Sequence, residues 1–372
     1  MDYNTVISNP SPHLTILLLG GTGAMGVHLV HILADHGNEV YVTSRKKYQS
    51  IDNIHYIQGD AHDMEFLRYL LAERYYDALV DFMVYSTEEF NMRKELLLST
   101  VGQYVYLSSA RVYADSKTPI LEDSPRLLDV CKMEEYLNTE EYALIKACQE
   151  NMLKESVYGN WTIIRPYITY SETRLQLGVM EKESWLYRAL HGRSIVFSKD
   201  IYNKYTTLTY GYNVSEGIAA IIGQSAALGE VFHITQPEAI KWREVQEVYL
   251  DVIEEKKGRR PRVLLTNDSL NLRKDWAQWQ VRLDRHYNRL FDNSKISKFI
   301  DTDHFVPPYE GLRKCLECFI ANPYWNTIIP ANNDEILKDK LTNEIASFSE
   351  FPNLKSYIKY LIKRFVYPKS KL

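Results

Sequence analysis

The chain has 372 residues, of which 45% are hydrophobic and 25% charged, and its formal net charge is −4. This length suffices for one large or two modest domains with a buried core. The 46 aromatic residues, 28 of them tyrosine, exclude an intrinsically disordered chain. The slightly acidic balance gives no overall field that attracts nucleic acid, and it therefore argues against a nucleic-acid partner.

The four cysteines are too few to staple a chain of this size by disulfides, which favours a reducing compartment. Cys315 and Cys318 have CxxC spacing, but no second pair or histidine cluster completes a zinc site, so we predict ordinary helix cysteines and no metal. Residues 1–13 are polar, and the apolar run at 14–19 is too short for a signal peptide or a membrane span. We therefore expect a cytoplasmic protein.

Short apolar runs alternate with longer amphipathic segments from residue 14 to about residue 168. The runs predict strands at residues 14–19, 39–43, 54–58, 78–84, 104–108 and 161–165. The amphipathic segments predict helices at residues 24–36, 64–75, 88–101 and 140–156. Strands and helices that alternate at this spacing indicate an α/β fold with a Rossmann-type, doubly wound parallel sheet.

The pattern becomes less regular after residue 165. Predicted helices at 175–192, 214–224 and 240–255 are interrupted by short β segments around Ile195, Leu208 and Val231. We therefore expect four regions: an N-terminal extension (1–13), the Rossmann domain (14–168, with elements returning from 209–235), a smaller C-terminal lobe (169–325) and a C-terminal tail (326–372).

The tail finishes in a segment with helical periodicity. Its apolar stripe consists of Leu354, Tyr357, Ile358, Leu361 and Phe365, and a row of lysines at 355, 359 and 363 lies beside it. Such a helix can lie on an anionic membrane surface. It can equally dock on the body of its own protein with the lysines solvated, and this second interpretation is the one we favour.

A glycine-rich loop directly follows the first predicted strand and opens the first predicted helix. It consists of Gly20, Gly21, Thr22, Gly23, Ala24, Met25 and Gly26. A pyrophosphate requires close approach of backbone without Cβ atoms and the partial positive charge of a helix N-terminus. The loop between a strand and a helix supplies both, and it predicts a dinucleotide cofactor.

The residues after the second and third strands bear on which cofactor binds. An acid after the second strand would bind the adenosine ribose, whereas an arginine would pair with a 2′-phosphate. The chain has Ser44 and Arg45 there and no acid, which favours NADP(H) and leaves NAD(H) as the alternative. Asp60, followed by Ala61, comes after the third strand, where it can accept from the adenine amino group or can cap the next helix.

Tyr142 and Lys146 lie four residues apart in a predicted helix and therefore share one face. An ammonium near a phenol stabilises the phenolate and lowers its pKa toward the range of general acid–base catalysis. Ser109 ends the fifth predicted strand, at the sheet edge where ligands bind in such folds. These three residues are our candidate catalytic set.

Taken together, these motifs resemble the extended short-chain dehydrogenase/reductase superfamily, in its NAD-dependent epimerase/dehydratase branch. The similarity runs from about residue 14 to about residue 324 and includes the glycine loop, the segments 108–113 and 164–170, and Tyr142-x-x-x-Lys146. The resemblance implies that Ser109 polarises the substrate oxygen, Tyr142 is the acid/base and Lys146 holds the nicotinamide ribose. It also implies that Phe82, Met83 and Tyr142 contact the cofactor and that the lobe binds the substrate.

The chain departs from that family in several places. Ser109 and Tyr142 are 33 positions apart, longer than is usual, with the surplus expected within 126–138. The family's Asn in the Arg-Pro-x-Asn segment is Ile168, and the usual Arg-Asp-Tyr/Phe of the lobe is replaced at 206–208. The segments 77–81, 164–170 and 185–192 are similar to a divergent branch that includes chloroplast stem-loop RNA-binding proteins. That branch often lacks the catalytic tyrosine, which this chain keeps as Tyr142.

Sugar-nucleotide 4,6-dehydratases carry an Asp-Glu pair just after the Ser/Thr, and this chain has Ala110 and Arg111 there. Dehydration is therefore disfavoured. The sequence predicts an NAD(P)-dependent oxidoreductase or epimerase that acts on a nucleotide-activated sugar by keto-reduction or 4-epimerisation, with Arg111 and Lys204 as candidate phosphate ligands. The alternative is a non-catalytic or RNA-binding protein on the same fold. The resemblance further implies a homodimer.

Overall fold

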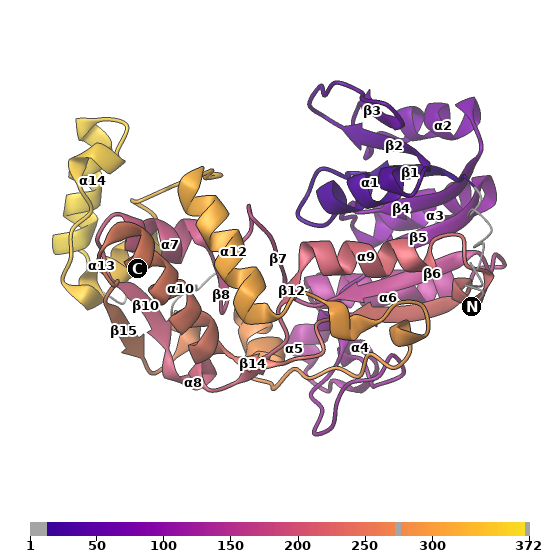
Figure 1. Ribbon diagram of the computed structural model, residues 1–372. Coiled ribbons are helices and arrows are strands. Elements are labelled where there is room, and N and C mark those ends of the chain that lie inside the picture. The colour runs from indigo at the N-terminus through magenta and orange to yellow at the C-terminus, as the bar shows by residue number, and fades with distance from the viewer. Residues whose placement is uncertain (1–12, 272–276, 369–372) are drawn as a thin grey trace, which may run out of the picture. The chain divides into compact units, whose positions relative to one another are not determined.

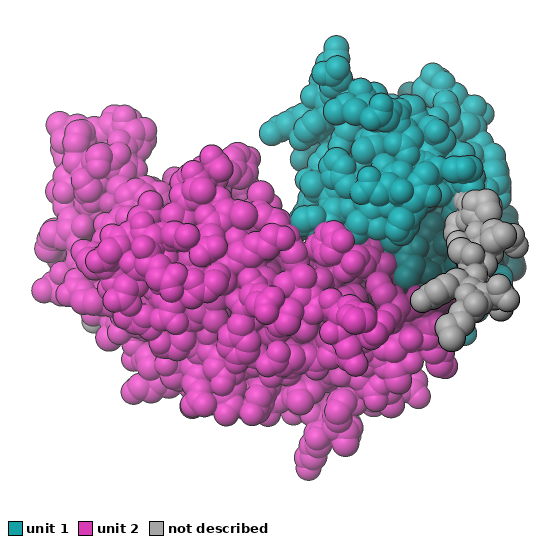
Figure 2. Space-filling model, viewed as in Figure 1, with its two compact units in different colours: residues 1–107, 149–164, 218–231 teal, residues 108–148, 165–217, 232–372 magenta. Residues whose placement is uncertain are grey.

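The computed structural model describes residues 13–271 and 277–368 of the chain. Apart from its last residue, the predicted N-terminal extension lies outside the described residues. The chain forms two compact units, drawn in different colours in Figure 2. Unit 1 holds residues 1–107, 149–164 and 218–231, and unit 2 holds residues 108–148, 165–217 and 232–372. The domain boundaries expected from the sequence remain a prediction.

A seven-stranded sheet forms the frame of unit 1, with strand order β13-β6-β5-β4-β1-β2-β3 (Figure 1). Its strands are β1 (Thr15–Leu19), β2 (Glu39–Ser44), β3 (Ile54–Gln58), β4 (Tyr76–Asp81), β5 (Val101–Leu107), β6 (Trp161–Pro166) and β13 (Glu230–Ile234). The helices that alternate with them are α1 (Gly26–Asp35), α2 (Met64–Glu73), α3 (Thr87–Thr100), α6 (Tyr142–Lys154) and α9 (Gly211–Ile221). Neighbouring strands from β3 to β6 pair in parallel, so the Rossmann-type, doubly wound sheet is confirmed.

Both faces of this sheet are covered. One core cluster combines residues of β1, β4, β5 and β6 with apolar residues of α2, α3 and α6. Other residues of these strands, such as Ile16, Val80 and Val105, are also fully buried. Strands that are buried on both faces read as continuous apolar runs, which explains why these runs were visible in the sequence.

Two tyrosines of this core direct their hydroxyls at one buried carboxylate. Tyr104 donates to Oδ2 of the fully buried Asp81 at 2.8 Å, and Tyr85 donates to Oδ1 of the same carboxylate at 3.3 Å. Asp81 also accepts from the backbone N–H of Met83 at 2.9 Å. The predicted strand 78–84 therefore ends early, because the Asp81 side chain turns the backbone away from the sheet; Val84 is exposed.

Unit 2 is built from short strand pairs and helices. The pairs are β7 (Thr169–Tyr170) with β12 (Thr209–Tyr210), β8 (Gln176–Leu177) with β9 (Met180–Glu181), β10 (Ile195–Ser198) with β15 (Val263–Thr266), and β11 (Tyr205–Thr206) with β14 (Ile240–Lys241). Its other helices are α4 (Leu127–Val130), α5 (Glu134–Leu137), α7 (Lys182–Leu190), α8 (Lys199–Tyr202), α10 (Trp242–Lys257), α11 (Gln278–Gln280), α12 (Pro308–Ala321), α13 (Asn333–Thr342) and α14 (Leu354–Phe365). Apolar residues of α7, α10 and α12 share its main core cluster.

One expectation for this region is wrong, and another holds only in part. The helix predicted at 175–192 begins only at Lys182, because residues 176–181 form the β8–β9 hairpin around Gly178, whose φ of 62° suits glycine. Only part of the predicted apolar stripe of the C-terminal helix is docked: Tyr357 and Leu361 pack in a small apolar cluster, whereas Leu354, Ile358 and Phe365 are exposed. Within the described residues, no helix has the length and apolar character needed to cross a membrane.

Candidate active site

The glycine loop lies between the end of β1 and the start of α1, as the sequence predicts. Gly20 has a φ of 72°, and its N–H donates to Oγ1 of Thr43 on β2 at 3.0 Å. The first turn of α1 contains no acidic residue, and Met25 provides no side-chain cap. The N–H groups at this helix start are therefore not neutralised by a local carboxylate, which suits an anion.

The loop fits a dinucleotide sterically as well. A Cβ on Gly26 would stand 2.6 Å from the backbone carbonyl carbon of Gly21, so only glycine allows the loop and helix to close on each other. A Cβ on Gly23 would project into open space, which is the space that a phosphate approaching the backbone needs. The loop thus has the tight turn, the open backbone and the helix N-terminus that a pyrophosphate requires.

The residues after β4 lie next to this loop, because β1 and β4 are neighbours. The N–H of Phe82 donates to the carbonyl of Leu19 at 3.0 Å, and a Cβ on Gly20 would meet the sulfur of Met83 at 2.8 Å. The structure therefore brings Phe82 and Met83 together with the glycine loop. Their role as cofactor contacts stays a prediction.

The residues that follow β2 and β3 are open to solvent. Arg45 is exposed and makes no ion pair with any residue that the structure describes, while Ser44 accepts from the N–H of Lys46 at 3.1 Å. Asp60 is also exposed and accepts from the N–H of His62 at 3.0 Å, next to the buried Ala61. The helix cap considered for Asp60 is supplied by Asp63 instead.

Ser109, Tyr142 and Lys146 all belong to unit 2, and the structure brings them together. Ser109 is near enough to Tyr142 for its hydroxyl to oppose the rise in the pKa of that phenol, and Lys146 Nζ lies 5.9 Å from the centre of the Tyr142 ring. Tyr142 is the first residue of α6, so Lys146 follows it by about one helical turn. Ser109 and Lys146 are both buried, at 7% and 1% exposure. This is a hydroxyl, a phenol and an ammonium in one cluster.

Electrostatics at Tyr142 are set by burial and by cations. Burial raises the pKa of Tyr142, while the positive charges of Arg111 and Arg174 and the Ser109 hydrogen bond oppose that rise. Arg111 Cζ lies 5.5 Å from the centre of the Tyr142 ring, and its terminal nitrogen pairs with Glu141. Arg174 pairs with Glu181 at 3.4 Å. The cations therefore act on a phenol that would otherwise ionise only with difficulty.

The segment 126–138, where the surplus between Ser109 and Tyr142 is expected, contains α4 and α5. Tyr136 on α5 is fully buried, packs against Trp279, and donates from its hydroxyl to Oε2 of Glu141 at 3.2 Å. Arg126 donates to the carbonyl of Ala147 at 3.2 Å. This segment thus packs against the start of α6, and its Tyr136 holds Glu141, the residue just before Tyr142, by a hydrogen bond.

Three of these residues were missed by reasoning from the sequence. Glu141 and Tyr136 precede Tyr142 closely, and their acidic and aromatic character was a usable signal. Arg174 is different, because its approach to Tyr142 depends on the path of the chain between β7 and β8.

Lys204 lies apart from this cluster. It lines a cavity of about 380 Å³ together with Lys117, His286 and Asn288, and Arg111 is absent from that lining. The two candidate phosphate ligands therefore do not share this cavity. Their role as substrate contacts stays a prediction.

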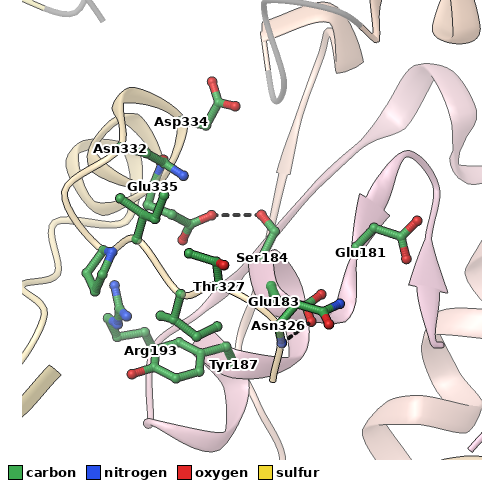
Figure 3. Close-up of a pocket in the computed structure, with 13 residues that line it drawn as sticks. Glu181, Glu183, Ser184, Tyr187, Arg193, Asn326, Thr327, Asn332, Asp334 and Glu335 are labelled. Carbon is green, nitrogen blue, oxygen red and sulfur yellow. Dashed lines mark hydrogen bonds between the residues drawn. The ribbon is translucent and has the colours of Figure 1, made fainter. Parts of the chain in front are cut away.

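Another cavity, of about 420 Å³, lies between α7 and the segment that leads into α13 (Figure 3). Glu335 accepts from the Ser184 hydroxyl at 2.7 Å, and Glu183 accepts from the N–H of Asn326 at 3.1 Å. Both carboxylates also have lysine partners, Lys338 for Glu335 and Lys182 for Glu183. These contacts attach the C-terminal segment to α7.

A model described as the NAD dependent epimerase/dehydratase family matches residues 16–234, which is more than half of the chain. The chain belongs to the NAD-dependent epimerase/dehydratase family. The matched range includes the glycine loop, Ser109, Tyr142 and Lys146.

Curated members and relatives of this family share only part of their length with the chain. The chloroplast stem-loop binding protein of 41 kDa b from Arabidopsis thaliana is 25% identical over 235 residues, which cover 59% of this chain and 58% of that protein. The UDP-glucose 4-epimerase of Neisseria meningitidis serogroup B is 30% identical over 139 residues, which cover 30% of this chain and 41% of the enzyme. The chain therefore spans roughly two to three fifths of the curated relatives it matches.

Solved structures in the epimerase/dehydratase family share the fold. An epimerase from Methanothermobacter thermautotrophicus aligns with a TM-score of 0.65 at 20% identity, covering 83% of this chain and 93% of that one. A UDP-glucuronic acid 4-epimerase from Bacillus cereus, in complex with UDP-glucuronic acid and NAD, aligns with a TM-score of 0.61 at 16% identity, covering 84% of this chain and all of that one. At these identities the likeness concerns the fold alone.

Proposed function

We propose that this protein is an NAD(P)-dependent enzyme that transfers hydride on a nucleotide-activated sugar, by keto-reduction or by 4-epimerisation. The observation that carries the proposal is that one cluster holds the Tyr142 phenol, Lys146 with its Nζ 5.9 Å from the Tyr142 ring, and Ser109, whose hydroxyl opposes the rise in the Tyr142 pKa. Membership of the epimerase/dehydratase family supports it, and so does the name of the UDP-glucose 4-epimerase relative.

The chemistry assigns one task to each residue. Ser109 holds the substrate oxygen by a hydrogen bond, and Tyr142 exchanges a proton with that oxygen. In oxidation the phenolate of Tyr142 takes the proton of the substrate hydroxyl while hydride leaves the carbon that bears this hydroxyl. In reduction the proton returns to the oxygen and the hydride to the carbon. The nicotinamide cofactor supplies or accepts that hydride when bound. Lys146 keeps positive charge near the phenol, and Arg111 adds to it.

We further propose that NADP(H) is preferred over NAD(H). Arg45 is exposed directly after β2, has no ion-pair partner among the described residues, and no acid ends that strand. A free guanidinium at this position suits a 2′-phosphate. Tighter binding of NADPH than of NADH, reversed or abolished by Arg45→Ala, is the expected result, and equal binding of both by the native protein would contradict it.

Dehydration is not part of the proposal. Ser109 is followed by Ala110, which is fully buried, and then by Arg111. The Arg111 guanidinium is already paired with Glu141. Neither supplies the additional acid and base for loss of water. Lys204 and Arg111 are retained as candidate ligands for substrate phosphates. A homodimer and a cytoplasmic location also remain predictions.

The experiment measures turnover of a panel of UDP- and dTDP-sugars, with NADPH consumption reporting keto-reduction and chromatography reporting epimerisation. We expect activity that Tyr142→Phe lowers by a factor of about 100 or more, with cofactor affinity unchanged. Tyr158→Phe, at a half-buried tyrosine outside the cluster, serves as the control. Full activity of Tyr142→Phe would contradict the proposal.

Native mass spectrometry of protein purified without added cofactor separates the two reactions. A retained oxidised cofactor indicates an epimerase, because both half-reactions use the same bound molecule. Protein that is empty and then takes up NADPH indicates a reductase that exchanges cofactor in each turnover.

The second candidate function is RNA binding without catalysis, favoured by the likeness to the Arabidopsis stem-loop binding protein. Binding of a structured RNA that weakens steeply with salt, together with no turnover on the sugar panel, would favour this alternative. The net charge of −4 argues against it.

A further inference from the structure

The C-terminal helix α14 divides into three longitudinal sectors. At 100° per residue, Tyr357, Tyr360, Leu361 and Arg364 lie in one sector. Leu354, Ile358, Ile362 and Phe365 lie in a second, and Lys355, Lys359 and Lys363 lie in a third. Each sector has its own chemistry and its own environment.

The first sector is docked on unit 2. The Tyr360 hydroxyl donates to Oδ2 of Asp339 on α13 at 2.7 Å and accepts from the N–H of Ala346 at 2.8 Å. Arg364 Nε donates to the carbonyl of Glu344 at 3.2 Å. Tyr357 and Tyr360 join a small apolar cluster with residues of α13. The helix is therefore fixed along its whole length by one side.

Helix α13, on which α14 packs, is held in place by a buried ion network. Asp339 of α13 is fully buried and receives hydrogen bonds from Arg188 Nη1 at 2.6 Å and from Arg193 Nη1 at 3.1 Å. Arg193 also pairs with Glu350, in the link between α13 and α14, at 2.5 Å. The orientation of the other two sectors of α14 toward solvent is thus set by a buried network.

The second sector is apolar and exposed. Leu354 and Phe365, at its two ends, are 60% and 62% exposed, and Ile358 and Ile362 between them are each 46% exposed. Val366, which follows the helix, is 71% exposed. Single exposed apolar residues are ordinary on a protein surface, but an unbroken row over three turns of one helix marks an interaction site.

The third sector is a basic row along the edge of the apolar one. Lys355 and Lys359 are exposed, and half-buried Lys363 reaches Asn333 at 3.1 Å. The sequence of α14 contains no acidic residue. An apolar row flanked by lysines, with nothing of opposite charge on the helix, complements a surface that is apolar inside and anionic at its edge.

We propose that α14 lies in the plane of an anionic membrane surface, with Leu354, Ile358, Ile362 and Phe365 inserted among the acyl chains and the lysine row at the lipid headgroups. The docked tyrosine sector remains on the protein. This inference concerns where the protein acts and holds independently of the reaction it catalyses.

Charge distinguishes this occupant from a second copy of the chain. Two α14 helices packed through their apolar rows would bring two lysine rows together without an acid between them. Like charges at such a contact oppose pairing. Anionic lipid headgroups instead attract each lysine near the surface.

The test is co-sedimentation of the full chain with vesicles of phosphatidylcholine alone or with added phosphatidylserine, at low and high salt. We expect binding only to the anionic vesicles and weakening by salt. Ile358→Glu should weaken binding at least tenfold, and the pair Lys355→Gln with Lys359→Gln by about 25-fold. Val157→Glu, at a 94% exposed apolar residue outside unit 2, should leave binding unchanged.

Three outcomes would overturn the proposal. One is no binding to anionic vesicles by the native chain. Another is binding that Ile358→Glu does not weaken although circular dichroism shows a native fold. The third is a dimer, detected by sedimentation velocity, that Ile358→Glu dissociates, since a second copy would then occupy the row. Turnover on soluble sugars reads the proposed reaction separately, so either proposal can fail alone.

Discussion

The guanidinium carbon of Arg111 lies 5.5 Å from the centre of the Tyr142 ring, and its terminal nitrogen pairs with Glu141, the residue just before that tyrosine. The ion pair with Glu141 thereby holds Arg111 near the Tyr142 phenol. Burial raises the pKa of Tyr142, and Arg111 is the foremost of the charges that oppose this effect. The position therefore tunes the residue proposed to move the proton.

Replacing Arg111 by Met should move the pH dependence of the proposed reaction. Without this cation the pKa of Tyr142 rises further, so the rate that depends on its phenolate should reach its plateau at a higher pH. The measurement is kcat against pH in the oxidative direction, with Arg313→Met, a surface arginine paired with Glu255, as the control. An unshifted profile would contradict this role, and a higher KM with kcat and profile both unchanged would show that Arg111 acts only on substrate binding.

A buried histidine should make stability depend on pH. Burial lowers the pKa of His233 to about 4 from an ordinary value of 6.5, although its hydrogen bond to the carbonyl of Asp292 opposes the shift. Above pH 6.5 the imidazole is neutral whether folded or unfolded. As the pH falls from about 6.5 to about 4, His233 is protonated in the unfolded chain but stays neutral in the folded protein. About 3 kcal/mol of the free energy of unfolding is lost over this range.

The measurement is urea unfolding between pH 7.5 and pH 4 for the native protein and for His233→Gln. The variant is less stable at neutral pH, because contacts of His233 with Asp292 and Tyr113 are lost. Its stability should nevertheless change less across this pH range. Parallel pH profiles for the two proteins would assign the acid sensitivity to other groups.

The buried ion network around Arg188 should matter more than any ion pair on the surface. Arg188 is fully buried and contacts Asp339 at 2.6 Å, Glu335 at 3.3 Å and Glu344 at 3.4 Å. Arg188→Met would leave these carboxylates short of one cation in a dry site. We expect a loss of about 3–5 kcal/mol in the free energy of unfolding.

Arg260→Met is the matched control. Arg260 contacts three carboxylates, at 2.6–2.9 Å, but its side chain is 37% exposed. Exposed pairs contribute about 0–1 kcal/mol, so this variant should unfold nearly like the native protein. Equal losses in the two variants would contradict a special role for the buried network.

The fold of unit 1 was predictable because its signals are local. Strands buried on both faces appear as apolar runs, and the glycine loop announces itself between a strand and a helix. The bounds of β3 match the prediction throughout, and those of α2 differ by two residues at one end. The closeness of Tyr142 and Lys146 was also predictable from helix spacing, whereas their meeting with Ser109 was expected from the family resemblance.

Other features depend on contacts distant in sequence. In α14, apolar residues occupy two sectors, and the pattern alone does not say which one docks. The docked sector is fixed by Asp339, which lies 21 positions before Tyr360 and accepts a hydrogen bond from the Tyr360 hydroxyl. The influence of Arg174 on Tyr142 likewise depends on the path of the chain between β7 and β8, not on spacing.

Ile168 shows what one departure from the family pattern does to the backbone. Its φ is 30°, a left-handed conformation that a β-branched residue rarely adopts and that Asn, the residue expected here from the family resemblance, tolerates better. Its carbonyl accepts from the N–H of Thr209 at 3.2 Å, so the β7–β12 pairing holds the strained conformation in place. Strain at one such residue costs of the order of 1–3 kcal/mol.

Ile168→Asn should therefore change the free energy of unfolding by less than about 1 kcal/mol, because relief of strain offsets the lost packing of a half-buried side chain. Ile57→Asn is the matched control: the same exchange at a half-buried isoleucine of β3 with ordinary φ. There nothing offsets the lost burial, and we expect a cost of about 2 kcal/mol. Urea unfolding of both variants decides the matter, because equal costs would mean that the backbone at Ile168 carries no strain that Asn relieves.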